Sequence, residues 1–177
     1  MENAGLPNLK DMPLEELEAF ITGLGKERYR ARQVMKCLYK QGFTSVDQMT
    51  PLSREFREEL SRRVTIASPR IVKTQTAKDT TKKVLFELQD GNFVESVLIP
   101  GKTHWTVCVS TQVGCRMGCR FCLTGKQGLT RNLLPSEIVG QLTALKTEMP
   151  EGPEIKNIVL MGMGEPLDNY DNVVKAI

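Results

Sequence analysis

The 177-residue sequence lacks the features that mark membrane or secreted proteins. It contains no run of about 18 apolar residues, so it predicts no transmembrane helix. The first residues, MENAGLPNLKDMP, lack the basic start and the apolar stretch of a signal peptide. Internal repeats and low-complexity tracts are also missing. We therefore expect a cytoplasmic globular protein that does not associate with membranes.

The sequence also has little histidine and a small net charge. The chain has one histidine, and its net charge of +3 is too small by itself to indicate a nucleic-acid partner. The excess lies entirely in residues 1–75, with 13 Lys/Arg against 10 Asp/Glu, whereas residues 76–177 hold 11 of each. Five of these cations crowd one stretch: Arg28, Arg30, Arg32, Lys36 and Lys40. This stretch is either a solvated helix face or a surface that contacts phosphates.

Hydrophobic periodicity predicts helices first and strands afterwards. The expected helices cover residues 13–23, 29–41 and 52–64. The expected strands cover residues 70–77, 82–89 and 92–99, with a hairpin turn at Asp90-Gly91. A strand (105–111), a loop (112–134), a helix (135–149), a strand (156–162) and the start of a further helix complete the chain. The strand 156–162 is almost wholly apolar, so we expect it to be buried on both faces, as in a parallel α/β sheet.

Three of the five cysteines fall in the segment Cys115-Arg-Met-Gly-Cys119-Arg-Phe-Cys122. Clustered thiols in a chain without a secretion signal indicate metal or redox chemistry rather than a disulfide framework. The spacing supplies three thiolates to a cubane iron–sulfur cluster, which normally takes four ligands. The iron left open could bind S-adenosylmethionine (SAM) through its amino and carboxylate groups, and reduction would then yield a 5′-deoxyadenosyl radical.

Two other interpretations of the cysteines stay open. A closed zinc site needs four ligands, and the candidates for a fourth are Cys108, His104 and Cys37. The three cysteines could also be unrelated reduced thiols.

A glycine-rich turn, Met161-Gly-Met-Gly-Glu-Pro166, directly follows the strand 156–162. Its glycines would let a ligand approach the backbone, and the Glu165 carboxylate could accept the ammonium group of SAM. A simple strand-end turn is the alternative. Since the turn comes one βα unit after the cysteines, both segments are predicted at the carboxyl ends of strands, where α/β barrels bind ligands.

These motifs together resemble a known enzyme family, the RlmN-type radical SAM methyltransferases, which modify C2 of an adenine in 23S ribosomal RNA. The resembling segments are YRARQVMKCLY (29–39), ESVLIP (95–100), CVSTQVGCRMGCRFCLTG (108–125) and LMGMGEPLDNY (160–170). They span nearly the whole chain. The relatives of this family include the C8-methylating Cfr type, which is kept as an alternative, as is a non-catalytic, metal-stapled RNA-binding module.

The resemblance implies the cofactors, the partners and a role for each site residue. The cofactors would be a [4Fe–4S] cluster and SAM; the partners would be 23S rRNA, tRNA and an electron donor such as flavodoxin, with a monomer at full length. Cys115, Cys119 and Cys122 would hold the cluster, and Phe121, Gly164 and Glu165 would bind SAM. Glu95 would be the acid/base of the active site. Cys108 would form a transient disulfide with a methyl-carrying cysteine.

The local sequence supports a functional role for Glu95 but does not decide whether Cys108 is functional. Glu95 interrupts the apolar strand FVESVLI, and a lone buried carboxylate marks a functional position because its burial is costly; an exposed site on an edge strand is the alternative. Cys108 lies between Val107 and Val109, where a buried inert thiol is equally expected.

The expected fold class is α/β, with three segments. A helical, RNA-binding accessory domain (1–69) precedes a β-hairpin connector (70–104) and the first part of a radical SAM partial (β/α) barrel (105–177). The methyl-carrying cysteine and the later barrel strands of the family are not found in this sequence. We therefore expect a truncated form that does not complete a methylation cycle alone.

Overall fold

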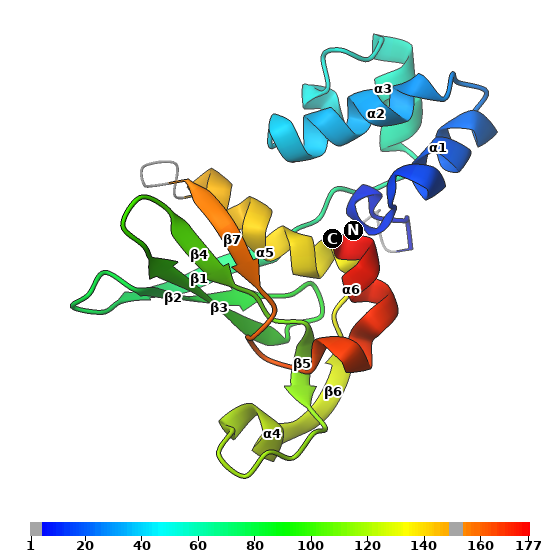
Figure 1. Cartoon of the computed structure of the whole chain (residues 1–177). Helices are drawn as coiled ribbons and strands as arrows, with labels where there is room; N and C mark the ends of the chain where they lie inside the picture. The colour runs from blue at the N-terminus through cyan, green and yellow to red at the C-terminus, as the bar shows by residue number, and fades with distance from the viewer. Residues whose placement is uncertain (1–4, 149–153) are drawn as a thin grey trace. The chain divides into compact units, whose positions relative to one another are not determined.

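The computed structural model describes residues 5–148 and 154–177 (Figure 1). The chain divides into two compact units, one ending at Ala67 and the other beginning at Ser68. In the described part of the chain, no helix is both long and apolar enough to cross a membrane.

The first unit is helical, as its periodicity predicts. Its helices are α1 (Leu14–Gly23), α2 (Tyr29–Met35) and α3 (Arg54–Ser61). The helix α2 does not continue regularly to residue 41 but passes into a π-helix (Lys36–Lys40), whose wider turn buries both Cys37 and Leu38. The start of α3 is set by Ser53, whose side chain accepts a hydrogen bond from the backbone N of Phe56, as serine caps do.

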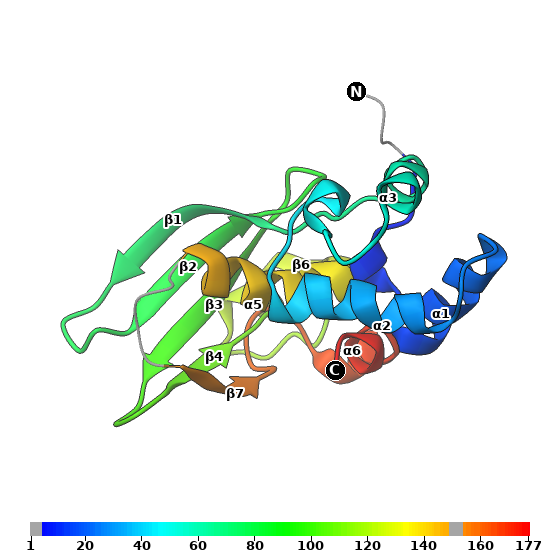
Figure 2. The same ribbon diagram turned by 90° about the horizontal axis from the view of Figure 1, so that it is seen from above.

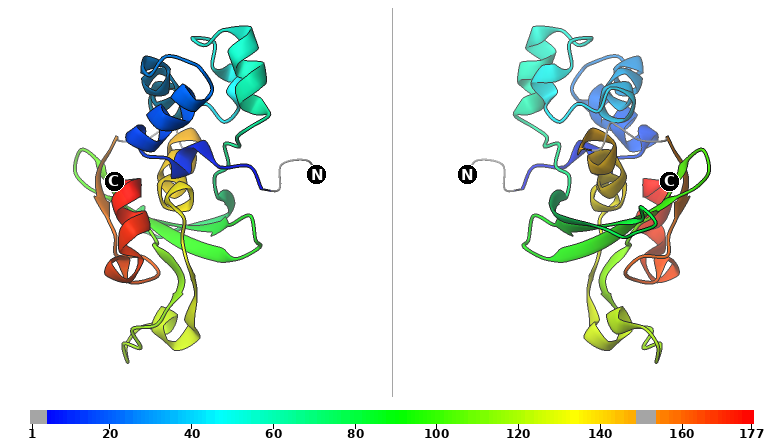
Figure 3. Two further views of the ribbon diagram at one scale, coloured as in Figure 1. Left: turned by 90° about the vertical axis from the view of Figure 1, so that its right-hand side faces the viewer. Right: turned by 90° about the vertical axis from the view of Figure 1, so that its left-hand side faces the viewer.

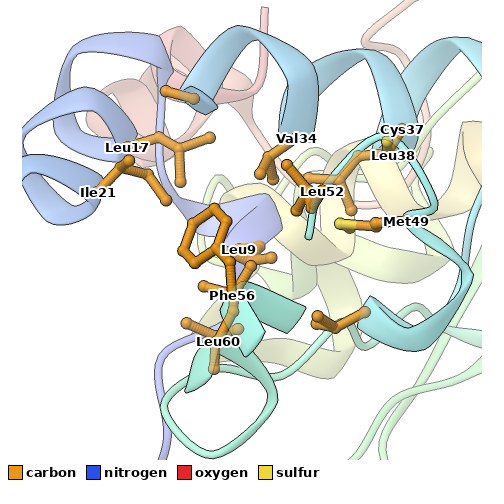
Figure 4. Packing of buried hydrophobic residues seen from close by; sticks show 13 residues of the cluster. Leu9, Leu17, Ile21, Val34, Cys37, Leu38, Met49, Leu52, Phe56 and Leu60 are labelled. Atoms are coloured by element: carbon orange, nitrogen blue, oxygen red, sulfur yellow. The ribbon is translucent and has the colours of Figure 1, made fainter. Parts of the chain in front are cut away.

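One apolar core holds this first unit together (Figure 4). Leu17 and Ile21 of α1, Val34 of α2, and Phe56 and Leu60 of α3 are at most 3% exposed. Burying a side chain of this size stabilises the fold by roughly 1.5–3 kcal/mol relative to leaving it in water. The unit therefore has its own core.

The second unit is built on a five-stranded sheet in the order β1-β2-β3-β4-β7. Its strands are β1 (Arg70–Thr76), β2 (Lys82–Glu87), β3 (Phe93–Pro100), β4 (Trp105–Cys108) and β7 (Ile155–Val159). The first four pair antiparallel in sequence order, and β4 pairs parallel with β7. The helical unit followed by a mixed sheet confirms the expected α/β class, and residues 70–104 contribute three strands to the same sheet as β4 and β7.

The two faces of this sheet differ. On one face, alternate residues of β2–β4 are buried in a core with residues of α5 (Pro135–Glu148) and α6 (Tyr170–Ala176); they are Val84, Phe86, Val94, Leu98 and Val107. Figure 2 shows α5 alongside the sheet. The residues between them form what we call the open face, defined by Lys83, Leu85, Glu95, Val97 and Cys108, which are half-buried or exposed. Period-two alternation thus separates an apolar face from a solvated one.

The segment 112–134 is not the plain loop expected from its sequence. It forms a hairpin of β5 (Gln112–Cys115) and β6 (Gly128–Asn132), with the short helix α4 (Leu123–Gln127) at its end (Figure 3). The sequences of β5 and β6 show little apolar alternation, because glycines occupy the positions where the two strands meet most closely. A Cβ on Gly114 would lie 1.9 Å from the carbonyl O of Gly128, so the strands approach too closely for a side chain there.

The expectation that strand 156–162 is buried on both faces is wrong. The strand β7 lies at the edge of the sheet, and the Ile158 side chain is 52% exposed. Ile158 and Leu160 line an apolar cleft of about 390 Å³ with Leu142 of α5. An apolar sequence alone does not report whether a strand has one neighbour or two.

Candidate active site at the carboxyl ends of β4 and β7

The parallel strands β4 and β7 end at the same edge of the sheet, and the chain beyond them continues in contact. The backbone N of Val109 donates to Val159 O (2.9 Å), and the N of Gly162 donates back to Val109 O (3.1 Å). A Cβ on Gly162 would lie 2.7 Å from the Val109 carbonyl, so this approach requires glycine. The glycine-rich turn therefore packs directly against the segment that leads into the cysteine hairpin.

Gly164 and Glu165 form the far side of this turn. Gly164 has a φ of +103°, and a Cβ there would lie 2.6 Å from the Cβ of Gln112, so glycine is required on both counts. The backbone N of Glu165 donates to Gln112 Oε1 (2.9 Å), while its own Oε1 accepts from Leu167 N (3.1 Å). The second bond orients the carboxylate at the start of the short 3₁₀-helix Pro166–Asn169.

The buried side chain of Gln112 joins the turn to the cysteine hairpin. Its Nε2 donates to Asn132 Oδ1 on β6 and to Asp168 Oδ2, both at 2.8 Å. Asp168 also accepts from Arg116 Nε at 2.8 Å, directly after Cys115. The hydrogen bond from Gln112, with Arg116 beside it, holds the pKa of Asp168 below its ordinary value. Sequence reasoning missed Gln112, because a single polar residue at a strand start carries no periodic signal.

A second buried carboxamide, Gln141 of α5, fixes the end of β4. It accepts from Ser110 N and Ser96 Oγ and donates to Ser110 O. The Ser110 hydroxyl donates to Glu95 O (2.6 Å) and accepts from Met163 N (2.8 Å). These bonds connect the β3 backbone at Glu95 with the glycine-rich turn. No sequence signal pointed to Gln141 or Ser110.

An ion-pair cluster at Arg131 of β6 holds the base of the cysteine hairpin. Its two terminal nitrogens contact the two carboxylate oxygens of Glu137 at 2.7 and 2.8 Å, and its Nε lies 2.6 Å from Asp90 Oδ2. Such bidentate pairing is a strong, geometrically specific arrangement. It holds the pKa of Asp90 well below its usual range. The hairpin is thereby connected to α5 and to the β2–β3 turn.

The three clustered cysteines occupy the end of this hairpin. Cys115 is buried, Cys122 is half-buried, Cys119 is exposed, and all are free thiols. Backbone N–H groups of Gly125 and Thr124 lower the pKa of Cys122, which favours the thiolate that binds iron. Within the described residues the sulfurs are not gathered into a metal-binding group. Their chemistry and their position within eight residues at the end of one hairpin nevertheless fit a three-thiolate ligand set.

Within the described residues of the second unit, neither Cys108 nor His104 forms a metal-binding group with the three cysteines. Cys108 is on the open face of the sheet. His104 precedes β4, whereas the hairpin follows β4, and the His104 ring lies 3.0 Å from the side-chain amide of Asn157. Cys37 belongs to the core of the first unit. The arrangement therefore offers no additional support to a closed four-ligand site.

Glu95 and Cys108 lie on the open face, on neighbouring strands. Cys108 pairs with Val97, two residues along β3 from Glu95. Glu95 is not the lone buried carboxylate suggested by its apolar neighbours: its side chain is 40% exposed, and Oε1 lies 2.9 Å from Lys83 Nζ. Cys108 is half-buried, and burial raises its pKa despite a hydrogen bond from Met161 N. The Cys108 side chain is therefore a thiol rather than a thiolate at neutral pH.

Phe121 completes the predicted site residues and lies within the cysteine loop. Its side chain is 93% exposed. An exposed ring beside Cys122 is available to stack on a flat ligand, which is how aromatic side chains contact bases.

Comparison with known proteins finds a family match in each of the two units. Residues 7–66 match the model of the ribosomal RNA large subunit methyltransferase N-terminal domain, and residues 109–177 match that of the radical SAM superfamily. The dual-specificity RNA methyltransferase RlmN of Syntrophus aciditrophicus is 63% identical over 170 residues. Over nearly its whole length, the chain is similar to RlmN-type radical SAM proteins.

Other members of the RlmN family match over the same extent. The RlmN of Geotalea uraniireducens is 51% identical over 96% of this chain. The crystal structure of a radical SAM methyltransferase from Sphaerobacter thermophilus superposes with a TM-score of 0.85 at 41% identity, over 96% of this chain and 50% of that one. The chain spans about half the length of the curated relatives it matches, 49% for the Syntrophus protein and 48% for the Geotalea protein.

The first prediction concerns the cysteine loop. Anaerobic reconstitution of this chain with iron and sulfide should give one [4Fe–4S] cluster, seen by its visible absorption and by electron spin resonance after reduction. Cys115→Ala, Cys119→Ala and Cys122→Ala should each abolish the cluster, because each removes one of three thiolates. Cys37→Ala is the matched control and should keep it. Stoichiometric zinc without iron under the same conditions would contradict the prediction.

The second prediction concerns Gln112. Gln112→Glu puts a second carboxylate beside Asp168, so the second unit should lose about 1–3 kcal/mol of unfolding free energy at pH 8. The loss should shrink as the pH falls toward 5, because the buried carboxyl takes up a proton and removes the repulsion. Urea unfolding at both pH values measures this, with the exposed Gln127→Glu as control. If the loss of unfolding free energy is equal at both pH values, charge repulsion is not the cause of the loss.

Proposed function

We propose that this chain supplies the cluster-binding, SAM-binding and RNA-binding parts of a radical SAM methyltransferase. The substrate is C2 of an adenine in 23S rRNA and in tRNA. The observation that carries the proposal is the Gln112 connection: a three-thiol hairpin and a GMGEP turn follow adjacent parallel strands and share one buried hydrogen-bond network. An RNA-binding module without catalysis would not need such a turn.

Each site residue has a role in this proposal. Cys115, Cys119 and Cys122 would hold the cluster, which would supply the single electron for the reductive cleavage of SAM. Three protein thiolates would leave SAM to complete the ligands of a cluster that normally takes four.

The glycine-rich turn and the open face supply the rest. Gly164 lets SAM approach the backbone, Glu165 accepts a hydrogen bond from its amino group, and the exposed Phe121 ring stacks on its adenine. Glu95 takes and returns a proton at its carboxylate. Cys108, held as a thiol by burial, is the group that pairs with a methyl-carrying cysteine.

The proposal also includes partners and location. A flavodoxin-like electron donor reduces the cluster, the enzyme acts as a monomer, and the RNA substrates place it in the cytoplasm.

The third prediction tests the activity. This chain replaces the matching 170 residues of the Syntrophus relative, and mass spectrometry of digested RNA detects methylated adenine. The chimaera should form 2-methyladenosine, and its Cys119→Ala form, which lacks one ligand, should form none. Methylation at C8 would instead support the Cfr-type alternative. A chimaera that binds its cluster and RNA but transfers no methyl group would contradict the proposed enzyme.

The first unit carries the RNA-binding part of the proposal. Arg28 and Arg32 are both ion-paired to Glu18, through Nη2 at 2.5 Å and Nε at 3.8 Å respectively. The arginine side chains are 74% exposed, whereas that of Glu18 is only 8% exposed. Arg30 lies over the Tyr29 ring at 4.8 Å. A buried carboxylate thus holds two exposed guanidinium groups side by side, ready for phosphates.

The fourth prediction follows from this arrangement. Arg28→Ala with Arg32→Ala should weaken binding of an RNA hairpin, and the slope of log affinity against log salt should fall by about 0.7 for each phosphate that is no longer neutralised. Fluorescence anisotropy at several salt concentrations measures both. The control is Arg54→Ala on α3, which removes an exposed arginine also paired to a glutamate. If the double variant behaves like the control, this surface is only a solvated face.

A further inference from the structure

The open face of the sheet extends beyond Glu95 and Cys108 onto the outer strands. Strand register places Gln75, Lys83, Val97 and Cys108 in one row across β1 to β4. The next row holds Lys73, Leu85 and Glu95. Because residues paired across strands project to the same face, Lys73 and Lys83 share the surface that carries the two candidate catalytic residues.

Positive charge is concentrated in this part of the sheet. Residues 73–83 contain four lysines and one acidic residue, Asp79. The Asp79 carboxylate is occupied within the β1–β2 turn, where it accepts from the backbone and hydroxyl of Thr81. Lysines together with hydroxyl and amide side chains are the groups that contact nucleic-acid phosphates and sugars.

The ion pair between Lys83 and Glu95 is one in which Lys83 can change its partner. Its two side chains are 47% and 40% exposed, and a surface ion pair of this kind contributes little stability. A phosphate could therefore replace Glu95 as the partner of Lys83 at small cost. Lys83 would then leave the Glu95 carboxylate free at the moment RNA is bound.

Protection of a sheet edge does not account for both lysines. Lysine on an edge strand commonly prevents edge-to-edge aggregation, and Lys73 on β1 fits that role. Lys83, however, lies on β2, which is paired on both sides. Its charge therefore requires another explanation, and the Glu95 pair alone does not explain why Lys73 and Gln75 continue the same polar surface.

We propose that Lys73, Gln75 and Lys83 form a track that binds the RNA backbone beside the target adenine, on the side of Glu95. The track rests on the proposed function, since it needs an RNA substrate and a base presented to the open face. A single strand suits it better than a duplex, because the target base must leave its stack to reach side chains on a sheet.

Lys82 provides a matched control within the same strand. It is the neighbour of Lys83 but belongs to the opposite face, where its Nζ lies 5.6 Å from the centre of the Trp105 ring. Lys82→Gln changes the charge by the same amount as Lys83→Gln. General electrostatic attraction would respond equally to both, whereas a track on the open face would not.

The experiment uses this chain and a synthetic RNA hairpin with unpaired adenines in its loop. The double variant Lys73→Gln/Lys83→Gln should bind about five- to tenfold more weakly, and the salt slope should fall by about 1.4, as expected for two lysines on single-stranded RNA. Lys83→Gln alone should lower the slope by about 0.7, whereas Lys82→Gln should leave it nearly unchanged. Thermal unfolding of each variant shows whether the fold is kept.

Lysine acylation of the unmodified chain gives an independent readout. Bound RNA should protect Lys73 and Lys83 from the reagent, as seen by mass spectrometry, while Lys156 on β7 stays reactive. Wild-type binding with no protection, and a Lys83→Gln variant that equals Lys82→Gln, would overturn the track while leaving the proposed function intact. If the wild-type chain shows no salt-dependent RNA binding at all, the RNA part of the proposed function fails together with the track.

Discussion

The buried carboxamide of Gln112 is the constraint on which the arrangement of the site depends. Its side chain is fully buried, so its donors and acceptor must find partners inside the protein. Those partners belong to three segments: β6, the glycine-rich turn and the 3₁₀-helix that follows it. A shift of any one segment would leave a buried polar group unpaired, at a cost of about 1–3 kcal/mol. The cysteine hairpin and the turn are therefore held in one register.

Close backbone contact further restricts the relative position of the cysteine hairpin and the glycine-rich turn. Gly162 and Gly164 touch the chain around Val109 and Gln112 so closely that a Cβ at either would lie under 3 Å from another atom. The segments that follow these two parallel strands therefore pack in direct contact. Ligand sites on α/β folds commonly form at such carboxyl ends, where loops can vary while the strands stay fixed. Beside them, the buried Ser110 connects the backbone of Glu95 to the same turn.

Much of the fold follows from local sequence, and the exceptions have physical causes. Periodicity predicted α1, α3, α5 and the β2–β3 hairpin, since each depends on its own alternation or cap. It missed β5 and β6, whose pairing through Gly114 and Gly128 leaves no alternating apolar pattern. It also misjudged the burial of β7, which depends on whether neighbouring strands are present. The environment of Glu95 was misread because its partner, Lys83, lies diagonally across a neighbouring strand.

The sequence by itself determined the local chemistry of this protein: the C-x3-C-x2-C spacing, the glycines of the turn, and the helical and strand periods. These features are readable because their parts lie within a few residues of one another. Only the tertiary structure decided which residues share a face and which polar groups meet. Gln112 contacts groups 53 and 56 residues away, and Gln141 contacts Ser110, 31 residues away. Such bonds join single polar residues with no repeating pattern, so they exist only once the sheet has brought distant segments together.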